Sequence, residues 1–203
     1  LNMQNAVSKV TYRIGNAHFT RKVFASHPDQ TIVMRLECDT PGQITFDLSM
    51  TSPHAFKCQT ISDDTLSMTG QVGPREETRL IGPWEGEGTR FAAQVKVAAE
   101  GGKVVAQGDK ISVRDADAVT LVYVAATGYV NYQDVSGDPL KKVDDYLAGV
   151  RGKSFEPLSH RHIDDYSRLF GRVAINLGGK GANENLPTDE RLKRVTEGRA
   201  DPL

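Results

Sequence analysis

The sequence predicts a mainly β protein, a two-sheet antiparallel β-sandwich followed by two linker helices and a final strand. Three observations favour this fold class. Short stretches of alternating apolar and polar residues recur about every ten residues, turns rich in glycine or proline separate them, and no helical periodicity appears before Asp134. Because no helices lie between the strands, parallel βαβ units are excluded and two packed antiparallel sheets are expected.

Four strands are expected within residues 1–50. Residues 10–14 alternate apolar and polar side chains up to Gly15-Asn16, a dipeptide typical of a two-residue hairpin turn. After the return strand and a short break, residues 31–38 and 44–50 resume the alternation. This order of strands and short turns predicts a meander.

Further strands are expected after residue 55, with one of them buried in the middle of the assembly. Apolar side chains alternate weakly over residues 57–61 and 66–69. The alternation is clearer at residues 91–97, 104–105 and 111–113. Residues 119–126 (VTLVYVAA) are apolar on both faces, which is typical of a strand covered on both sides.

The last third of the chain contains the helical patterns. Asp138 can cap a helix that Pro139 begins and that ends by Gly152. Residues 158–170 carry apolar side chains at helical spacing, which indicates an amphipathic helix docked on another surface. After a stop at Gly171, the alternation of Val173, Ile175 and Leu177 predicts the final strand. The expected domains are a sandwich (1–134), helices with the last strand (135–178) and a linker (179–203).

Size and charge exclude several classes of protein. The chain has 203 residues, of which 38% are hydrophobic, and a formal net charge of -1, which suits one domain with a real core and gives no basic field for nucleic acid or anionic membranes. No apolar segment approaches the roughly 20 residues that span a bilayer. Leu1 is not an initiator methionine and strand-like sequence follows at once, so we expect an upstream part of the protein.

Cysteine and histidine spacing does not indicate a metal site. Cys38 and Cys58 could form a bridge only if their strands are neighbours, and buried free thiols are the simpler interpretation. His160 and His162 are two residues apart on a predicted helix and therefore point to different faces, so we expect one buried and one exposed. No metal and no cofactor are predicted.

The residues that suggest hydrolytic chemistry have simpler explanations. Ser26, His27 and Asp29 crowd into one turn, where the geometry of a catalytic triad is hard to achieve, so we interpret them as an ordinary loop between strands. Adjacent carboxylates diverge instead of facing each other across a cleft, which makes solvated faces, turns and caps the better explanation of Asp63-Asp64, Asp144-Asp145 and Asp164-Asp165. Asp165 can still pair with Arg168, with Arg172 or with a neighbouring domain.

One loop is the best candidate for contact with a ligand. Trp84 can stack on the apolar face of a sugar, and the carboxylates of Glu85 and Glu87 can accept hydrogen bonds from its hydroxyl groups. The other interpretation is that Trp84 folds down over a sheet as a plug.

Several longer motifs resemble one enzyme family. In order along the chain they are YRIGNAHFTRKVFASHPDQTIVMRL, VTLVYVAATGYVNYQDVSGDP, HRHIDDYSRLFGRVAINLG and LPTDERL. Over residues 11–191 the chain resembles glycoside hydrolase family 95, the inverting α-L-fucosidases, among which some members act on α-L-galactosides.

The resemblance implies a non-catalytic role for this chain. Enzymes of this family have an amino-terminal β-sandwich of the supersandwich kind, a helical linker, an (α/α)6 barrel that contains the catalytic residues, and a carboxy-terminal β domain. No catalytic residue can therefore be assigned here, and the first part of the family's sandwich is missing before Leu1. We expect the chain to brace the barrel of its parent, an exported (periplasmic or extracellular) enzyme that hydrolyses terminal α-L-fucosides of glycans.

The resemblance also places the contacts with the barrel on two linker helices, Asp138 to Arg151 and Ser159 to Phe170. The residues expected to pack there are Leu140, Val143, His160, Ile163, Asp165 and Tyr166. Two alternatives stay open. One is an independent carbohydrate-binding module that holds a fucosylated glycan at the Trp84 loop or on a sheet face, and the other is a scaffold or adhesion domain without a ligand.

Overall fold

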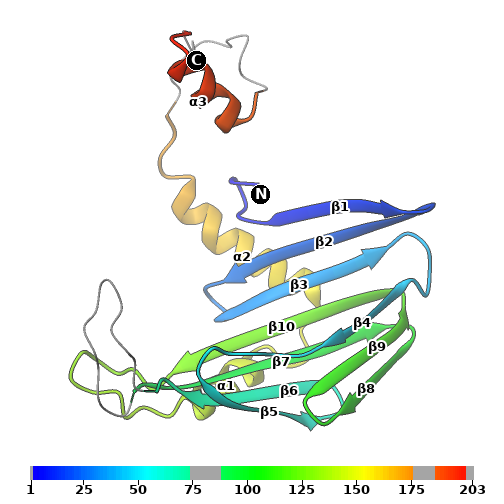
Figure 1. The fold of residues 1–203 in the computed structure, drawn as a ribbon, viewed down its shortest axis with the longest axis vertical. Helices are drawn as coiled ribbons and strands as arrows, with labels where there is room; N and C mark the ends of the chain where they lie inside the picture. The colour runs from blue at the N-terminus through cyan, green and yellow to red at the C-terminus, as the bar shows by residue number, and fades with distance from the viewer. Residues whose placement is uncertain (1, 74–87, 176–185, 200–203) are drawn as a thin grey trace. The chain divides into compact units, whose positions relative to one another are not determined.

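The computed structural model describes residues 2–73, 88–175 and 186–199. These residues form ten strands and three helices (Figure 1). In chain order the elements are β1 (Ser8–Ile14), β2 (Ala17–Ser26), β3 (Thr31–Cys38), β4 (Ile44–Leu48), β5 (Ala55–Ser62), β6 (Thr65–Gln71), β7 (Arg90–Glu100), β8 (Lys103–Gln107), β9 (Lys110–Ala116), β10 (Ala118–Thr127), α1 (Pro139–Gly149), α2 (Phe155–Phe170) and α3 (Thr188–Thr196).

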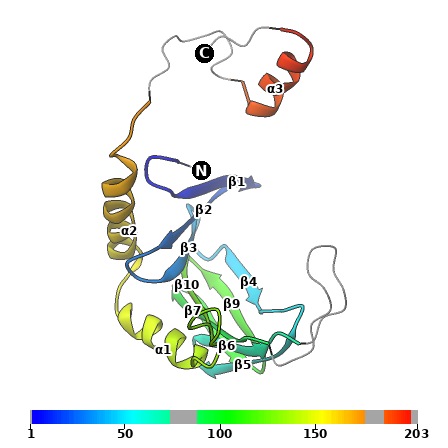
Figure 2. The same ribbon diagram turned by 90° about the vertical axis from the view of Figure 1, so that its left-hand side faces the viewer.

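The strands form two antiparallel sheets, which confirms the predicted fold class. The larger sheet has seven strands in the order β1-β2-β3-β10-β7-β6-β5, and the smaller has three in the order β4-β9-β8. β10 lies at the centre of the larger sheet between β3 and β7, as its two apolar faces predicted. The smaller sheet lies against one face of the larger one, and α1 and α2 lie on the other side (Figure 2).

The main core lies between the two sheets. Alternation along each strand of the larger sheet divides its side chains between a sandwich-side face, which meets the smaller sheet, and a helix-side face, which meets α1 and α2. The sandwich-side face buries Val95, Val97 and Val119 against Ile111 and Val113 of β9. The apolar side chains of the predicted alternation are therefore the ones buried against the second sheet.

The strand pairing explains the first hairpin turn and the state of the two cysteines. Ile14 pairs with Ala17, so Gly15 and Asn16 form the predicted two-residue hairpin turn, and Gly15 takes a φ of 59° that favours glycine. Cys38 and Cys58 are both free and half-buried. They lie on β3 and β5, which are separated by three other strands, so the condition for a bridge is not met.

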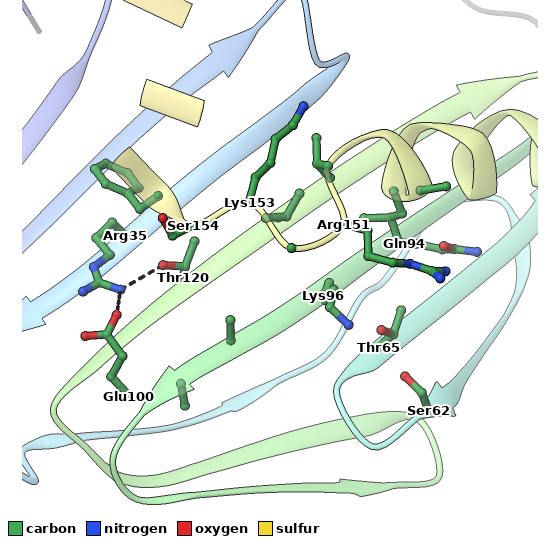
Figure 3. Close-up of a pocket in the computed structure, with 18 of the residues that line it drawn as sticks. Arg35, Ser62, Thr65, Gln94, Lys96, Glu100, Thr120, Arg151, Lys153 and Ser154 are labelled. Carbon is green, nitrogen blue, oxygen red and sulfur yellow. Dashed lines mark hydrogen bonds and ion pairs between the residues drawn. The ribbon is translucent and has the colours of Figure 1, made fainter. Parts of the chain in front are cut away.

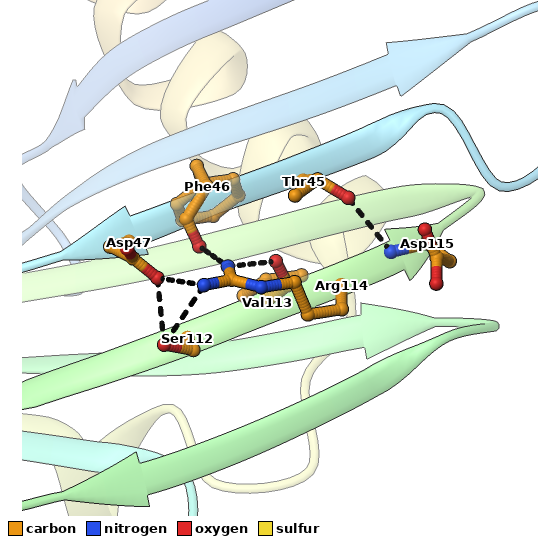
Figure 4. Close-up of polar contacts among 7 residues, drawn as sticks. All are labelled: Thr45, Phe46, Asp47, Ser112, Val113, Arg114 and Asp115. Carbon is orange, nitrogen blue, oxygen red and sulfur yellow. Dashed lines mark hydrogen bonds and ion pairs between the residues drawn. The ribbon is translucent and has the colours of Figure 1, made fainter.

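Polar cross-strand contacts occupy the outer face of the smaller sheet (Figure 4). Arg114 donates to the Asp47 carboxylate at 2.5 Å and to the carbonyl oxygen of Phe46 at 2.9 Å, and Ser112 Oγ donates to the same carboxylate at 2.7 Å. The hydrogen bond from Ser112, followed by that from Arg114, lowers the pKa of Asp47. These contacts join β4 to β9 on the solvent-facing side of the smaller sheet.

Both predicted linker helices are present, with different bounds. Asp138 caps α1 by accepting a hydrogen bond from the Lys141 backbone nitrogen at 3.1 Å, as predicted. α2 begins at Phe155, four residues before the predicted start at Ser159. Its first turn is helical because Phe155 and Leu158 insert into a second buried cluster on the helix-side face. None of the described helices is long and apolar enough to cross a bilayer.

The predicted final strand was wrong for the residues that can be checked. Residues 171–175 contain no strand, and Val173 and Ile175 are exposed. Alternation alone does not make a strand, because a strand needs a neighbour for its backbone hydrogen bonds. Leu177 lies outside the described residues.

The chain divides into two compact units, residues 1–169 and residues 170–203. The first unit contains the sandwich, α1 and nearly all of α2. The second contains α3, and none of the side chains of α3 is buried.

Candidate functional site

The helix-side face of the larger sheet carries a groove beside α1. Its volume is about 640 Å³, which is within the usual range of ligand pockets. The floor comes from β3, β10, β7 and β6, and the wall comes from the end of α1 and the connection to α2. Figure 3 shows Arg35, Thr120 and Glu100 together at one end, with Gln94 and Arg151 towards the other.

An ion pair closes the first end of the groove. The Arg35 guanidinium donates to Glu100 at 2.6 Å and to Thr120 Oγ1 at 3.0 Å, and a second carboxylate, Glu37, lies 3.4 Å away. The hydrogen bond with Glu100 raises the pKa of Arg35 and lowers the pKa of Glu100. Both groups therefore stay charged, and Arg35 is held in place across three strands.

Polar groups line the other end of the groove. Gln94 on β7 is almost fully buried and donates from Nε2 to the Asp144 carboxylate of α1 at 2.7 Å. Next to it, Lys96 donates to Asp64 at 2.6 Å. Burial raises the pKa of Asp64, but hydrogen bonds from Lys96, Thr65 and Ser62 outweigh burial and hold this pKa below its ordinary value.

The polar groups of the groove suit the binding of a polar partner. A general acid needs a pKa raised towards neutrality, whereas the pKa of Glu100 in the groove is lowered, and so is that of Asp64, the partner of the lining residue Lys96. Within the described ranges, no three His, Cys, Asp or Glu side chains are grouped so that they could hold a metal ion. The groove offers hydrogen-bond donors and acceptors to a polar partner.

The turn between β2 and β3 holds α2 through one buried carboxylate. The Asp29 side chain is 1% exposed and accepts hydrogen bonds from Ser26 Oγ at 2.8 Å, Lys153 Nζ at 3.2 Å and Arg161 Nε at 3.0 Å. Burial raises the pKa of Asp29, but the hydrogen bonds from Ser26 and Lys153 and the charges of Arg161 and Lys153 outweigh it, so the net pKa is lowered. We call these four residues the Asp29 anchor.

The structure gives no support to a triad at this turn. The His27 ring is largely exposed, and its Nδ1 lies 3.8 Å from the Asp165 carboxylate of α2. Ser26 donates its hydroxyl hydrogen to Asp29 and the His27 ring faces Asp165, so the two do not form the serine–histidine pair of a triad. The interpretation of this turn as a loop with a structural role fits these contacts.

Further contacts tie α2 to the N-terminal residues. The His162 ring is buried, stacks on Phe24 with centroids 4.8 Å apart, and places Nε2 3.0 Å from the carbonyl oxygen of Asn5. One turn later, Tyr166 Oη donates to the carbonyl oxygen of Met3 at 2.7 Å. His160 is exposed, so the prediction of one buried and one exposed histidine is confirmed.

The residues predicted to pack on another domain have different environments. Leu140 and His160 are exposed, and Ile163, Asp165 and Tyr166 are half-buried. Val143 is fully buried against Ala92 and Val124, in the contact of α1 with its own sheet. Asp165 pairs with Arg168 at 3.1 Å, one of the partners expected for it.

Packing of these residues on another domain stays a prediction. Trp84, Glu85 and Glu87 lie outside the described residues.

Neither the Asp29 anchor nor the groove could be identified from the sequence. Asp29 meets Lys153 and Arg161 across 124 and 132 residues of sequence, a separation that no local pattern can report. Arg35 and Thr120 are 85 residues apart. The sequence did show an acidic residue, Asp29, in the turn after Ser26. It could not show which positively charged side chains would contact that carboxylate.

Two family models match consecutive parts of the chain. Residues 1–132 match the N-terminal domain of glycosyl hydrolase family 65, and residues 154–203 match the catalytic domain of glycosyl hydrolase family 95. The second match begins at the start of α2, the helix that the Asp29 anchor holds. The predicted resemblance to family 95 is confirmed by this match and by the curated relatives.

The relatives are much longer than this chain. It is 29% identical to "Alpha-L-fucosidase 2" of Arabidopsis thaliana over 95% of its own length and 25% of the relative. It is 24% identical to "Probable alpha-fucosidase A" of Aspergillus niger over 97% of its length and again 25% of the relative. The chain therefore spans about a quarter of each of these proteins.

A solved structure similar in outline is "Putative kojibiose phosphorylase from human microbiome", with 9% identity and a TM-score of 0.42 over 84% of this chain and 24% of that one. The family assignment rests instead on the first family match, which covers well over half of the chain. The chain belongs to the glycosyl hydrolase family of N-terminal domains described for family 65, and a segment of the family 95 catalytic domain follows in the same chain.

Proposed function

We propose that this chain is the non-catalytic N-terminal part of an α-L-fucosidase, in which it braces the catalytic domain. Both curated relatives are named as fucosidases, and each extends well beyond the quarter of its length that this chain spans. The pKa of Glu100, which lines the groove, is lowered, which does not suit a general acid. Catalysis is therefore proposed for the part of the parent protein outside these residues.

One observation carries the proposal. The segment that matches the catalytic-domain model leaves a series of large apolar side chains exposed, namely Leu169, Val173, Ile175, Leu192 and Val195. Large apolar side chains gathered in one segment are usually covered by a partner. A catalytic domain that this segment begins would cover them, and no separate binding partner is needed.

The attachment of α2 supports the bracing role. α2 begins where the catalytic-domain match begins, and the sandwich holds it through the Asp29 anchor, through His162 and through Tyr166. Because α2 is held at these points, its orientation relative to the sandwich is fixed. The segment that follows α2 in the chain therefore starts from a fixed position. The sandwich would thereby restrict the motion of the catalytic domain.

The proposed activity is tested by measuring sugar release by the full-length parent protein and by this chain alone. The substrates are a fucosyl-α1,2-linked oligosaccharide and, in parallel, an α-L-galactoside. We expect the parent to release fucose and this chain to release neither sugar. Release of fucose by this chain alone would contradict the non-catalytic role, and a parent active only on the galactoside would contradict the proposed substrate.

A further inference from the structure

Part of the helix-side face of the larger sheet is left open by the two linker helices. α1 covers this face around Ala92 and Val124, and α2 covers it around Phe24 and Val33. Ala98 on β7 lies on the same face but is exposed. The groove beside α1 lies over this open part of the sheet.

Aliphatic side chains form much of the groove. Ala98 and Val122 lie on its floor, and Leu147 and Ala148 of α1 lie on its wall. These side chains can pack on the C–H groups of a ligand, but they neither donate nor accept hydrogen bonds. The polar groups around them therefore decide which ligands fit.

Gln94 brings a hydrogen-bond acceptor to the groove. It is 2% exposed, and its Nε2 donates to Asp144 at 2.7 Å. Within the described parts of the chain its Oε1 accepts no hydrogen bond, and Thr31 Oγ1 is the one fully buried side-chain oxygen or nitrogen without a partner. Gln94 Oε1 therefore reaches solvent, at a residue that lines the groove. A hydroxyl group of a ligand can donate to it.

Arg151 is the cation of the groove that has no carboxylate partner. The other lysine and arginine side chains that line it form the pairs Arg35–Glu100, Lys96–Asp64 and Lys153–Asp29. Among the residues that the structure describes, none forms an ion pair or a hydrogen bond with the Arg151 side chain. Figure 3 shows this side chain extending from the wall of the groove towards Gln94. Its guanidinium can donate to oxygen atoms of a ligand.

Two further carboxylates disfavour an anionic ligand. Asp144 and Glu156 also line the groove, and neither forms an ion pair within the described ranges. An anion bound to Arg151 would face these like charges, whereas a hydroxyl group can donate to a carboxylate and accept from a guanidinium. The groove therefore suits a neutral ligand with several hydroxyl groups.

We propose that the groove is a binding site for a short neutral glycan. The C–H face of one sugar ring lies on Ala98 and Val122, and its hydroxyl groups accept from Arg151 and donate to Gln94 and Asp144. The volume of about 640 Å³ suits a di- or trisaccharide. The choice of a glycan among neutral hydroxylated ligands rests on the proposed function, since both curated relatives are named as fucosidases.

The test is a titration of this chain, isotope-labelled, with two trisaccharides, followed by the amide chemical shifts in NMR spectra. The neutral probe carries a fucosyl-α1,2 linkage, and the acidic probe carries a sialic acid. We expect the neutral probe to shift amides of residues 94–98 and 151–154 and to bind at least about tenfold more tightly than the acidic one. Its Kd should not change with salt, because a neutral ligand is not screened.

Two variants with matched controls locate the site. Arg151→Ala removes a charged hydrogen-bond donor and should weaken binding about fivefold or more, and Ala98→Phe fills the floor and should abolish binding. The controls Arg21→Ala and Ala125→Phe change exposed residues on the sandwich-side face of β2 and β10 and should bind like wild type. The dispersion of each amide spectrum reports whether the variant is folded.

Three results would overturn the proposal: no shifts in the wild-type chain, shifts confined to residues outside the groove, or tighter binding of the acidic probe. The wild-type titration does not need the variants, so a variant that fails to fold leaves the test decisive. Binding to this chain is measured without hydrolysis. A parent that releases no fucose would therefore contradict the proposed function, and a chain that binds no neutral probe would contradict the glycan site.

Discussion

At the scale of single residues, the Asp29 carboxylate accepts hydrogen bonds from side chains of three different segments. Ser26 belongs to β2, Lys153 to the connection after α1, and Arg161 to α2. A buried carboxylate with several charged donors is costly to disrupt, because removal of one partner leaves the others without compensation. The Arg35–Glu100 pair differs, since Glu100 is largely exposed and water weakens the interaction.

Replacement of Asp29 by asparagine should destabilise this chain. Asp29→Asn keeps the shape of the side chain but removes the charge that faces Lys153 and Arg161, so we expect the free energy of unfolding to fall by about 1–3 kcal/mol. Urea denaturation followed by circular dichroism measures it. The exposed Asp63→Asn serves as the control, with an expected change below about 0.5 kcal/mol. Equal stability of the two variants would show that the Asp29 anchor contributes little.

The stabilisation by Asp29 should depend on pH in a defined direction. Its pKa in the folded chain is below the ordinary value of 3.8, so the carboxylate stabilises the folded state above that pH and loses this effect as the pH falls towards the folded pKa. The difference in unfolding free energy between wild type and Asp29→Asn should be constant from about pH 7 to pH 5 and narrow below about pH 4. Urea titrations at four pH values would reveal it, and a difference that widens in acid would contradict the assignment.

At the scale of elements, α2 depends on its first two turns. Phe155 and Leu158 are buried with Phe24, Val33 and Val122, whereas Leu169 near the other end of the helix is exposed. The helix is therefore packed on the sandwich at its start. His162 and Tyr166 contact the N-terminal residues further along, and Leu169 near the end of the helix stays exposed.

Leu158→Ala should cost far more stability than Leu169→Ala. The first substitution leaves a cavity in a fully buried cluster, for which a loss of about 2–5 kcal/mol is usual, while the second removes an exposed side chain and should cost below about 0.5 kcal/mol. Thermal and urea unfolding of the two variants measure the difference. Similar losses for both would mean that α2 is not packed on the sandwich as described.

The sequence predicted elements well where the signal is local. The two-residue turn at Gly15-Asn16, the buried β10 and the cap at Asp138 each depend on residues next to one another in the chain. Prediction was wrong where the outcome depends on a distant partner. Residues 173–175 alternate like a strand without forming one, and the early start of α2 depends on a cluster formed with β2, β3 and β10.

At the scale of the whole molecule, residues 1–132 match an N-terminal domain model and residues 154–203 match a catalytic-domain model. Which strands form which sheet, and where the groove lies, could not be predicted, because alternation indicates that a strand has a buried face but not which sheet buries it. The resemblance of several motifs did predict the family, since four ordered motifs together are specific. The contacts with a barrel could not be predicted from the apolar stripes of the helices. Val143 lies in such a stripe, but it packs on the larger sheet of this chain.

The central claim, that the sandwich braces the catalytic domain, is tested most directly by heat inactivation of the full-length parent. We would compare the temperature of half-inactivation of fucose release for wild type, Asp29→Asn and the control Asp63→Asn, and measure kcat and KM well below that temperature. The account predicts that Asp29→Asn inactivates several degrees lower than the other two, with kcat and KM unchanged at low temperature, because the variant loosens α2 without touching the reacting atoms. Identical inactivation temperatures for all three proteins would contradict it.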